Sequence, residues 1–143
     1  MSDDPILPEW PVGTVAILVT SGERPHAIPV SALLRAGPRL VLVGLADHRE
    51  SLTRLRARPE ITLAICAQRL AISVDGRARV LEQALVEGVA AVAVDVLAIH
   101  DHDRPTFAIH EGVEWEWTDA PAAQRDAEVH AALRRLAAAD DRR

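Results

Sequence analysis

The segment "HDHD" at residues 100–103 holds the densest group of metal-type ligands in the sequence. His100 and His102 are two residues apart, so in a strand both imidazoles lie on one face. Imidazole and carboxylate groups together suit several divalent metals, and His110 follows nearby. However, the segment runs directly into Arg104-Pro105, which is a turn signal. An exposed polar strand end explains this pattern better than a metal centre, so we predict no bound metal.

A second chemical pattern is "VEWEWT" at residues 113–118. In a strand it places Val113, Trp115 and Trp117 on one face and Glu114 and Glu116 on the other. An aromatic face of this kind indicates either a wall beside a cofactor or substrate, or packing in the core or a dimer interface. Packing is the simpler interpretation.

Other catalytic patterns are missing from the sequence. Ser21, Ser31 and Ser73 lie in no G-x-S-x-G motif, and no glycine pattern typical of a Walker or Rossmann nucleotide site occurs. Cys66 is the single cysteine, which excludes a disulfide framework and a cysteine-based zinc site. Its apolar surroundings, "ITLAICA", predict a small buried side chain.

Composition narrows the class of protein further. The formal net charge is −5 and the pI is about 5.6, which argues against a broad nucleic-acid surface. The N-terminal segment lacks the apolar region of a signal peptide. The longest apolar stretch, residues 88–99, contains Asp95 and is too short to cross a membrane. We therefore expect a cytoplasmic protein that binds neither nucleic acid nor membrane.

The surrounding elements are mostly strands. Residues 14–20, 26–34 and 39–45 predict an antiparallel meander whose second strand contains Pro29. Residues 47–59 then predict a short helix, with Asp47 as N-cap, Glu50 as its capping-box partner and Pro59 as its end. Further strands are predicted at 61–67, 70–82, 89–101, 106–110 and 113–118.

The C-terminal residues predict a second helix, at about 119–139. Asp119 is the expected N-cap and Pro121 an early helical residue. Val129, Leu133 and Leu136 form a narrow apolar stripe along it. With no repeat or linker, the pattern indicates one domain over residues 1–143, mainly β, with a sandwich or barrel architecture.

The order of four segments resembles the pyridoxamine 5′-phosphate oxidase-like split-barrel family. These are "GERPHAIPV" (22–30), "LVLVG" (40–44), the Arg-rich helix ending in "RPEITLAI" (58–65), and "GRARV" (76–80), and the resemblance spans roughly residues 8–118. It implies an antiparallel split β-barrel with a short helix after the third strand and a C-terminal helix. It also implies a homodimer that binds FMN, or in some branches a deazaflavin, in clefts at the dimer interface.

The same resemblance implies a set of cofactor-binding residues. The strand from His26 to Ser31 would lie along the isoalloxazine ring, Gly44 and Leu45 would pass beside the ribityl chain, and the helix start would meet the phosphate. The nine residues are His26, Pro29, Val30, Ser31, Gly44, Leu45, Arg49, Ser51 and Arg54. The family's S-R-K sequence aligns here with Arg49-Glu50-Ser51, which leaves the phosphate to Arg49 and Arg54.

This resemblance predicts an FMN-dependent oxidoreductase acting on a small-molecule substrate. Two other functions stay open. One is a flavin-binding module without turnover, such as a carrier or sensor; the other is a dimeric split barrel that holds no cofactor. His26 either orients a ring carbonyl or substrate, or is an ordinary polar residue at a strand end.

Overall fold

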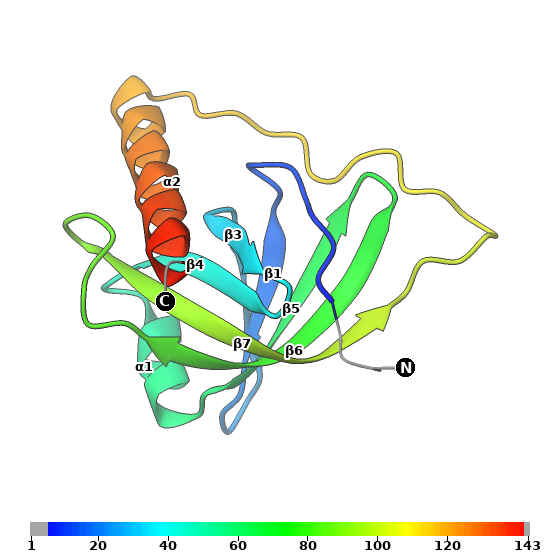
Figure 1. The fold of residues 1–143 in the computed structure, drawn as a ribbon, viewed down its shortest axis with the longest axis horizontal. Helices are drawn as coiled ribbons and strands as arrows, with labels where there is room; N and C mark the ends of the chain where they lie inside the picture. The colour runs from blue at the N-terminus through cyan, green and yellow to red at the C-terminus, as the bar shows by residue number, and fades with distance from the viewer. Residues whose placement is uncertain (1–5, 142–143) are drawn as a thin grey trace.

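The computed structural model describes residues 6–141 and consists mainly of β-strands (Figure 1). The elements in chain order are β1 (Ala16–Thr20), β2 (His26–Val30), β3 (Leu33–Gly37), β4 (Leu40–Ala46), α1 (Glu50–Ala57), β5 (Glu60–Ala67), β6 (Leu70–Val80), β7 (Val89–Asp101) and α2 (Ala120–Asp141). Seven antiparallel strands form one curled, half-barrel sheet in the order β2-β1-β5-β6-β7-β4-β3. The prediction of a mainly β barrel with two helices is confirmed.

The predicted single strand at 26–34 is wrong, because the chain leaves one edge of the sheet and joins the other. β2 pairs with β1 at one edge and β3 pairs with β4 at the opposite edge. The two residues between them, Ser31 and Ala32, form the link, and the Gly44 amide donates to the Ala32 carbonyl oxygen at 2.8 Å. The expected meander is therefore two hairpins that lie at opposite edges of the sheet.

The concave side of the sheet holds the main core. Alternate residues of each strand point inward, and the fully buried side chains include Leu63, Ile65 and Val74. Leu7, from the N-terminal segment, is buried against the same core. Its amide donates to the Pro38 carbonyl oxygen at 2.8 Å, so this segment closes one side of the core.

The helix α1 begins two residues later than the predicted cap. Arg49 occupies the N-cap position without a side-chain cap bond. The Asp47 amide instead donates to the Gly88 carbonyl oxygen at 2.9 Å, which extends the contact between β4 and β7. Glu50 lies 3.5 Å from Arg54 on the helix surface. The predicted capping box is therefore wrong, because sheet pairing continues past the end of β4 and holds Asp47 outside the helix.

The helix α2 covers the convex side of the sheet over β3 and β4 (Figure 1). Asp119 caps it as predicted: the carboxylate accepts a hydrogen bond from the Ala122 amide at 3.0 Å. Val129 and Leu133 are buried against Leu42 of β4 in a second apolar cluster, with Leu136 partly buried beside them. No helix within residues 6–141 is long and apolar enough to cross a membrane.

Residues 102–118 form an irregular strap that runs from β7 over the top of the sheet to α2 (Figure 1). The strands predicted at 106–110 and 113–118 are both wrong. Alternation alone does not make a strand, because the backbone groups also need a neighbouring strand. Instead the strap makes single contacts, such as the Ile109 carbonyl oxygen accepting from the Arg69 amide at 2.9 Å.

Candidate functional site

The strand β2 places its expected ring-contacting residues on two different sides of the sheet. Pro29 is exposed on the convex side, opposite Ile17 of β1. Val30 is buried in the core, while His26 and Ser31 are half-buried at the two ends. Because β2 is an edge strand, a proline that lacks an N–H costs no ladder hydrogen bond on its open side. The edge position therefore accounts for Pro29 without a ligand.

The strand β4 does not offer an open path at Gly44 and Leu45. The Leu45 side chain belongs to the core and is 4% exposed. A Cβ placed on Gly44 would lie 3.1 Å from Leu85 and 3.1 Å from Val129, which is already a tight contact. Val129 comes from α2, so the surface beside Gly44 is filled by the protein's own side chains.

Of the three phosphate ligands expected at the start of α1, only one has a side chain that is both exposed and without a partner in the described structure. Arg49 is exposed at the N-cap position. Ser51 is 1% exposed, and its hydroxyl has no hydrogen-bond partner within the described structure. Arg54 donates to the Arg24 carbonyl oxygen at 3.0 Å and thereby braces the turn before β2. Arg49 alone is therefore free to meet an incoming anion.

The structure thus brings the nine residues together only in part. Gly44 bonds to Ala32, the residue after Ser31 in the link between β2 and β3, and Arg54 bonds to the turn that precedes His26. None of the nine lines the pocket between α2 and the sheet or the pocket bordered by residues 11–14 and 110–113. Pro29 on the open side of β2 and Arg49 at the start of α1 are exposed, whereas the surface beside Gly44 of β4 is occupied by Leu85 and Val129.

The convex surface around Pro29 is apolar and uncovered. The strand register places Pro29, Ile17 and Ala64 in one row across β2, β1 and β5. Cys66, two residues farther along β5, is exposed on the same side. The prediction that Cys66 is buried is wrong, because its apolar run alternates between the two faces of the sheet.

Polar side chains take over on the neighbouring strands of this convex surface. Thr62 donates to Asp75 at 2.9 Å, and the second Asp75 oxygen lies 2.9 Å from His100 Nε2. The hydrogen bond from His100, followed by that from Thr62, holds the pKa of Asp75 below its ordinary value. Ser73 Oγ lies 2.6 Å from His102 Nε2. The sequence pattern identified the two histidines as candidate ligands. Only the three-dimensional structure shows that they contact Asp75 and Ser73 of β6.

These partners bear on the metal interpretation of "HDHD". His100 faces Asp75, while His102 lies beyond the end of β7 and faces Ser73. Among the residues that the structure describes, no three or more histidine, cysteine, aspartate or glutamate side chains are grouped as a metal site would need.

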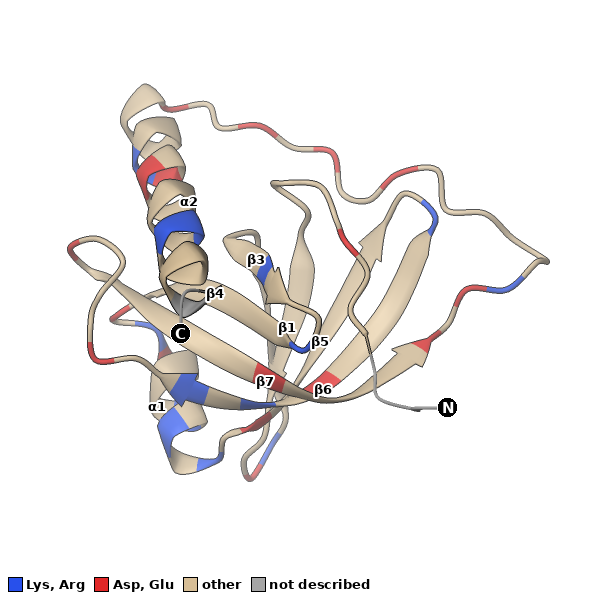
Figure 2. Ribbon diagram, in the orientation of Figure 1, with Lys and Arg blue, Asp and Glu red and all other residues tan. Residues whose placement is uncertain are grey.

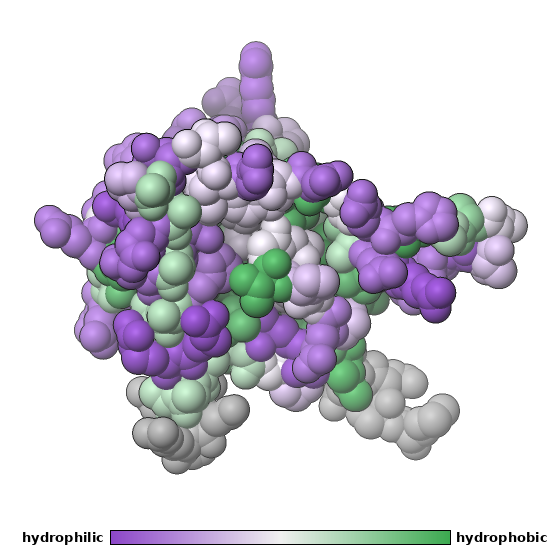
Figure 3. Space-filling view, turned by 90° about the horizontal axis from the view of Figure 1, so that it is seen from above, coloured by the Kyte–Doolittle hydropathy of each residue, from purple (hydrophilic) through white to green (hydrophobic). Residues whose placement is uncertain are grey.

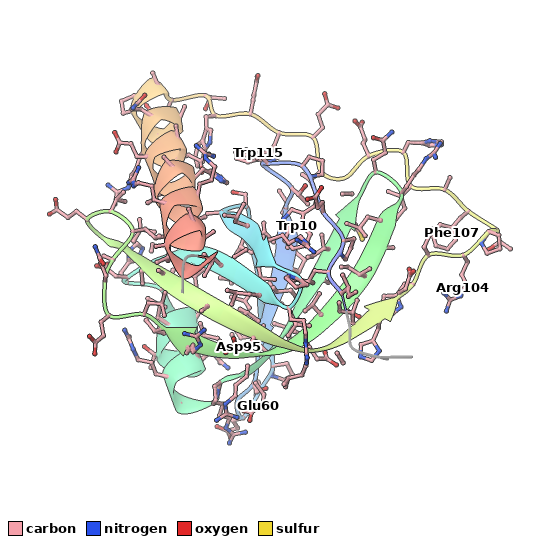
Figure 4. The ribbon with its side chains drawn as sticks, viewed as in Figure 1. Trp10, Glu60, Asp95, Arg104, Phe107 and Trp115 are labelled. Atoms are coloured by element: carbon pink, nitrogen blue, oxygen red, sulfur yellow. The ribbon has the colours of Figure 1, made fainter. Side chains whose placement is uncertain are left out.

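The aromatic residues of the strap stay at the surface. Trp115 and Trp117 meet edge to face with ring centroids 5.2 Å apart, and both are exposed. The Trp115 indole N–H donates to the Gly13 carbonyl oxygen at 2.8 Å, which fastens the strap to the N-terminal segment (Figure 4). Phe107 lies at the outer tip of the strap. From above, apolar side chains appear in separate patches among hydrophilic ones (Figure 3).

Charge is distributed unevenly between these elements. Arg residues gather on α1 and the nearby part of β6, whereas the strap carries Asp and Glu (Figure 2). Arg49, Arg56 and Arg58 of the α1 segment are all exposed. This basic end is the part of the surface where an anionic group is best accommodated.

Comparison with known proteins identifies the fold. No family model and no curated protein sequence matches the chain. Among solved structures, a Listeria innocua protein named for pyridoxamine 5′-phosphate oxidase is similar over 62% of this chain and 88% of its own, with 13% identity and a TM-score of 0.53. A Lactobacillus delbrueckii protein of the same name matches over 61% and 84%, with 14% identity and a TM-score of 0.55.

A third similar structure is BorF, the flavin reductase component of a bacterial two-component tryptophan halogenase. It matches 64% of this chain and 81% of its own, with 14% identity and a TM-score of 0.54. At this identity the likeness concerns the arrangement of the strands and helices. The chain therefore has the split-barrel fold shared by pyridoxamine 5′-phosphate oxidase-like proteins and flavin reductases.

Proposed function

We propose that this protein is a flavin-dependent oxidoreductase that binds FMN and acts on a small molecule as a homodimer. The observation that carries the proposal is the uncovered apolar surface around Pro29 on a fold shared with flavin reductases. A bound flavin supplies hydride or electron transfer, and the protein supplies its position and a dry environment.

In this proposal the ring of the flavin lies against Pro29 and Ile17, which are adjacent and exposed. Ser31 and His26, at the two ends of β2, offer hydrogen-bonding groups to the ring edge. The phosphate lies near Arg49, whose guanidinium offers a charge-assisted bond beside the first free amides of α1. These contacts need no movement of the core.

The second copy in the homodimer covers the same convex surface. Soluble monomers rarely expose a large contiguous apolar patch, and here Ile17, Pro29 and Cys66 all face solvent. Light scattering should give twice the chain mass of 15.5 kDa. Ile17→Glu should shift the protein toward monomers, whereas Ala138→Glu, on the exposed side of α2, should not. A wild-type protein that scatters as a monomer at micromolar concentration contradicts the dimer.

Titration with FMN tests the cofactor. Arg49→Ala should weaken binding by about 10- to 150-fold, the range for losing one charge-assisted bond. Arg56→Ala is the matched control, because Arg56 is equally exposed but lies in the last turn of α1. Equal affinity in all three proteins means that the phosphate lies elsewhere. A parallel titration with a deazaflavin distinguishes the two cofactors, and reduction by NAD(P)H with an acceptor separates an enzyme from a binding module.

One observation favours a cofactor-free dimer as the second candidate. Leu85 and Val129 fill the surface beside Gly44, where the resemblance implies a ribityl chain. If a flavin uses this surface, Leu85→Ala should increase FMN affinity by removing the exposed end of the obstruction. If neither wild type nor Leu85→Ala binds FMN at high micromolar concentration, the cofactor-free dimer is the better account.

A further inference from the structure

The strap of residues 102–118 is acidic and carries exposed aromatic side chains. It holds four acidic residues and one arginine. Glu114 and Glu116 are exposed, and no ion pair within residues 6–141 involves either of them. Beside them, Trp115 and Trp117 are 37% and 45% exposed. The strap therefore presents carboxylates and indole rings together at the surface.

The α1 segment carries the opposite charge. Residues 49–58 contain four arginines and one glutamate. Arg54 pairs with that glutamate, Glu50, and donates to the turn before β2. Arg56 and Arg58, at the C-terminal end of the helix, are exposed, and neither has an ion-pair partner among the described residues. Two guanidinium groups are therefore available to carboxylates from outside the chain.

The strap and α1 lie at opposite ends of β1. The strap is fastened to Gly13, three residues before β1 begins, and Arg54 of α1 binds the turn that follows β1. Figure 2 shows the acidic residues of the strap above the sheet and the arginines of α1 below it. Within one chain the two charged surfaces are separated by at least the length of β1, about 17 Å for five residues. The uncovered row of Ile17 and Pro29 lies between them.

We propose that, in the homodimer, the strap of each copy docks on α1 of the other copy. The carboxylates of Glu114 and Glu116 pair with two guanidinium groups, those of Arg56 and Arg58 of the partner subunit, and the exposed indoles stack on them. A two-fold axis that lies in the convex surface, at right angles to β1, reverses the direction of β1. It therefore brings the strap of each copy to the α1 of the other, and both contacts form at once.

A second copy fits these surfaces better than an unrelated basic protein does. Each copy supplies one acidic and one basic surface, so a single symmetric arrangement satisfies all of them. The same arrangement covers Ile17 and Pro29, which an unrelated partner on the strap would leave exposed. The inference rests on the homodimer of the proposed function, and it names the contacts that set the orientation of the two copies.

Charge reversal tests the contact, with the dimer dissociation constant measured by sedimentation at low salt. One variant carries Glu114→Arg and Glu116→Arg, and the other carries Arg56→Glu and Arg58→Glu. Each should weaken dimerisation by about tenfold or more, because like charges then face one another in both contacts. All four side chains are exposed, so both variants should fold, which circular dichroism checks.

Two further measurements separate a specific contact from an effect of net charge. An equimolar mixture of the two variants should dimerise as tightly as wild type, because both contacts of the heterodimer again join arginine with glutamate. The matched control carries Glu82→Arg and Glu87→Arg, at exposed positions between β6 and β7. It changes the net charge as much as the strap variant does, and it should also dimerise as wild type.

Three results overturn the proposal: both variants dimerise as wild type does, the mixture stays as weak as its components, or the control loses as much as the strap variant. While the wild type is dimeric, each of these results leaves the flavin proposal standing, because none of the substituted residues is among the nine considered for the flavin. A monomeric wild type contradicts the homodimer itself, and this inference with it.

Discussion

Gly76→Ala should destabilise the protein strongly, because the space beside this glycine is already occupied. Gly76 is buried in the central strand β6, at the β-bulge opposite Val96 of β7. A Cβ at this position would lie 2.5 Å from Val94 Cγ1 and 3.0 Å from the Asp95 carbonyl oxygen. One of these atoms belongs to the backbone of the paired strand, so β6 and β7 must separate to admit a methyl group.

The size of the effect follows from two opposing terms. Overpacking a core typically costs about 1–3 kcal/mol, and a backbone obstacle between central strands places this case toward the upper end. Replacing glycine with alanine also reduces the conformational entropy of the unfolded chain, which stabilises the folded state by about 0.4–1 kcal/mol. We therefore expect a net loss of about 2 kcal/mol in the free energy of unfolding.

The assay is urea-induced unfolding followed by circular dichroism, with Gly37→Ala as the matched control. Gly37 lies at the end of β3, and a Cβ there would meet nothing closer than 3.9 Å. Only the unfolded-state term then applies, so this variant should be unchanged or slightly stabilised. If the free energy of unfolding of Gly76→Ala lies within about 0.5 kcal/mol of the wild-type value, the inferred steric conflict between β6 and β7 is wrong.

Three further predictions concern α2, Asp75 and the strap. Leu133→Ala should cost about 2–5 kcal/mol in thermal unfolding, because Leu133 is fully buried between α2 and the sheet; a loss below about 1 kcal/mol contradicts the docking of that helix. The lowered pKa of Asp75 means that its contribution to stability is present above the ordinary carboxyl pKa and is lost as the pH falls through the folded value. Unfolding curves between about pH 5 and about pH 2 should therefore fall less steeply for Asp75→Asn than for wild type, and parallel curves refute this linkage. Trp115→Phe removes the hydrogen bond to Gly13, so limited proteolysis should cut the strap faster than in wild type, and an equal rate of cutting shows that this bond does not fasten it.

Local patterns in the sequence were sufficient to predict an element whose bounds depend only on its own residues. The strand β7 ends where predicted, because an apolar run that is interrupted only by Asp95 lies between Gly88 and the polar "HDHD" segment. Asp119 caps α2 as predicted, because a cap is a contact between residues three apart. The split-barrel resemblance also held, since the order and spacing of four segments describe the whole sheet.

Predictions failed where a residue's role depends on a distant neighbour. Residues 113–118 alternate as a strand does, but no strand lies beside them, and Trp115 bonds to Gly13 instead. Asp47 has the right spacing for a capping box, yet its amide is engaged by Gly88, 41 residues away along the chain. Cys66 lies in an apolar run, but the direction it faces depends on the register of β5.

The candidate site also divides into features set by local sequence and features set by contacts between distant residues. The sequence by itself determined β1, β4, β5, β6 and β7 and the helix that follows β4, because these depend on short-range pattern and chain order. Only the tertiary structure decided that Pro29 lies on an open edge and that α2 fills the surface beside Gly44. These facts depend on which elements pack against each other, and packing brings together residues that are far apart in the chain.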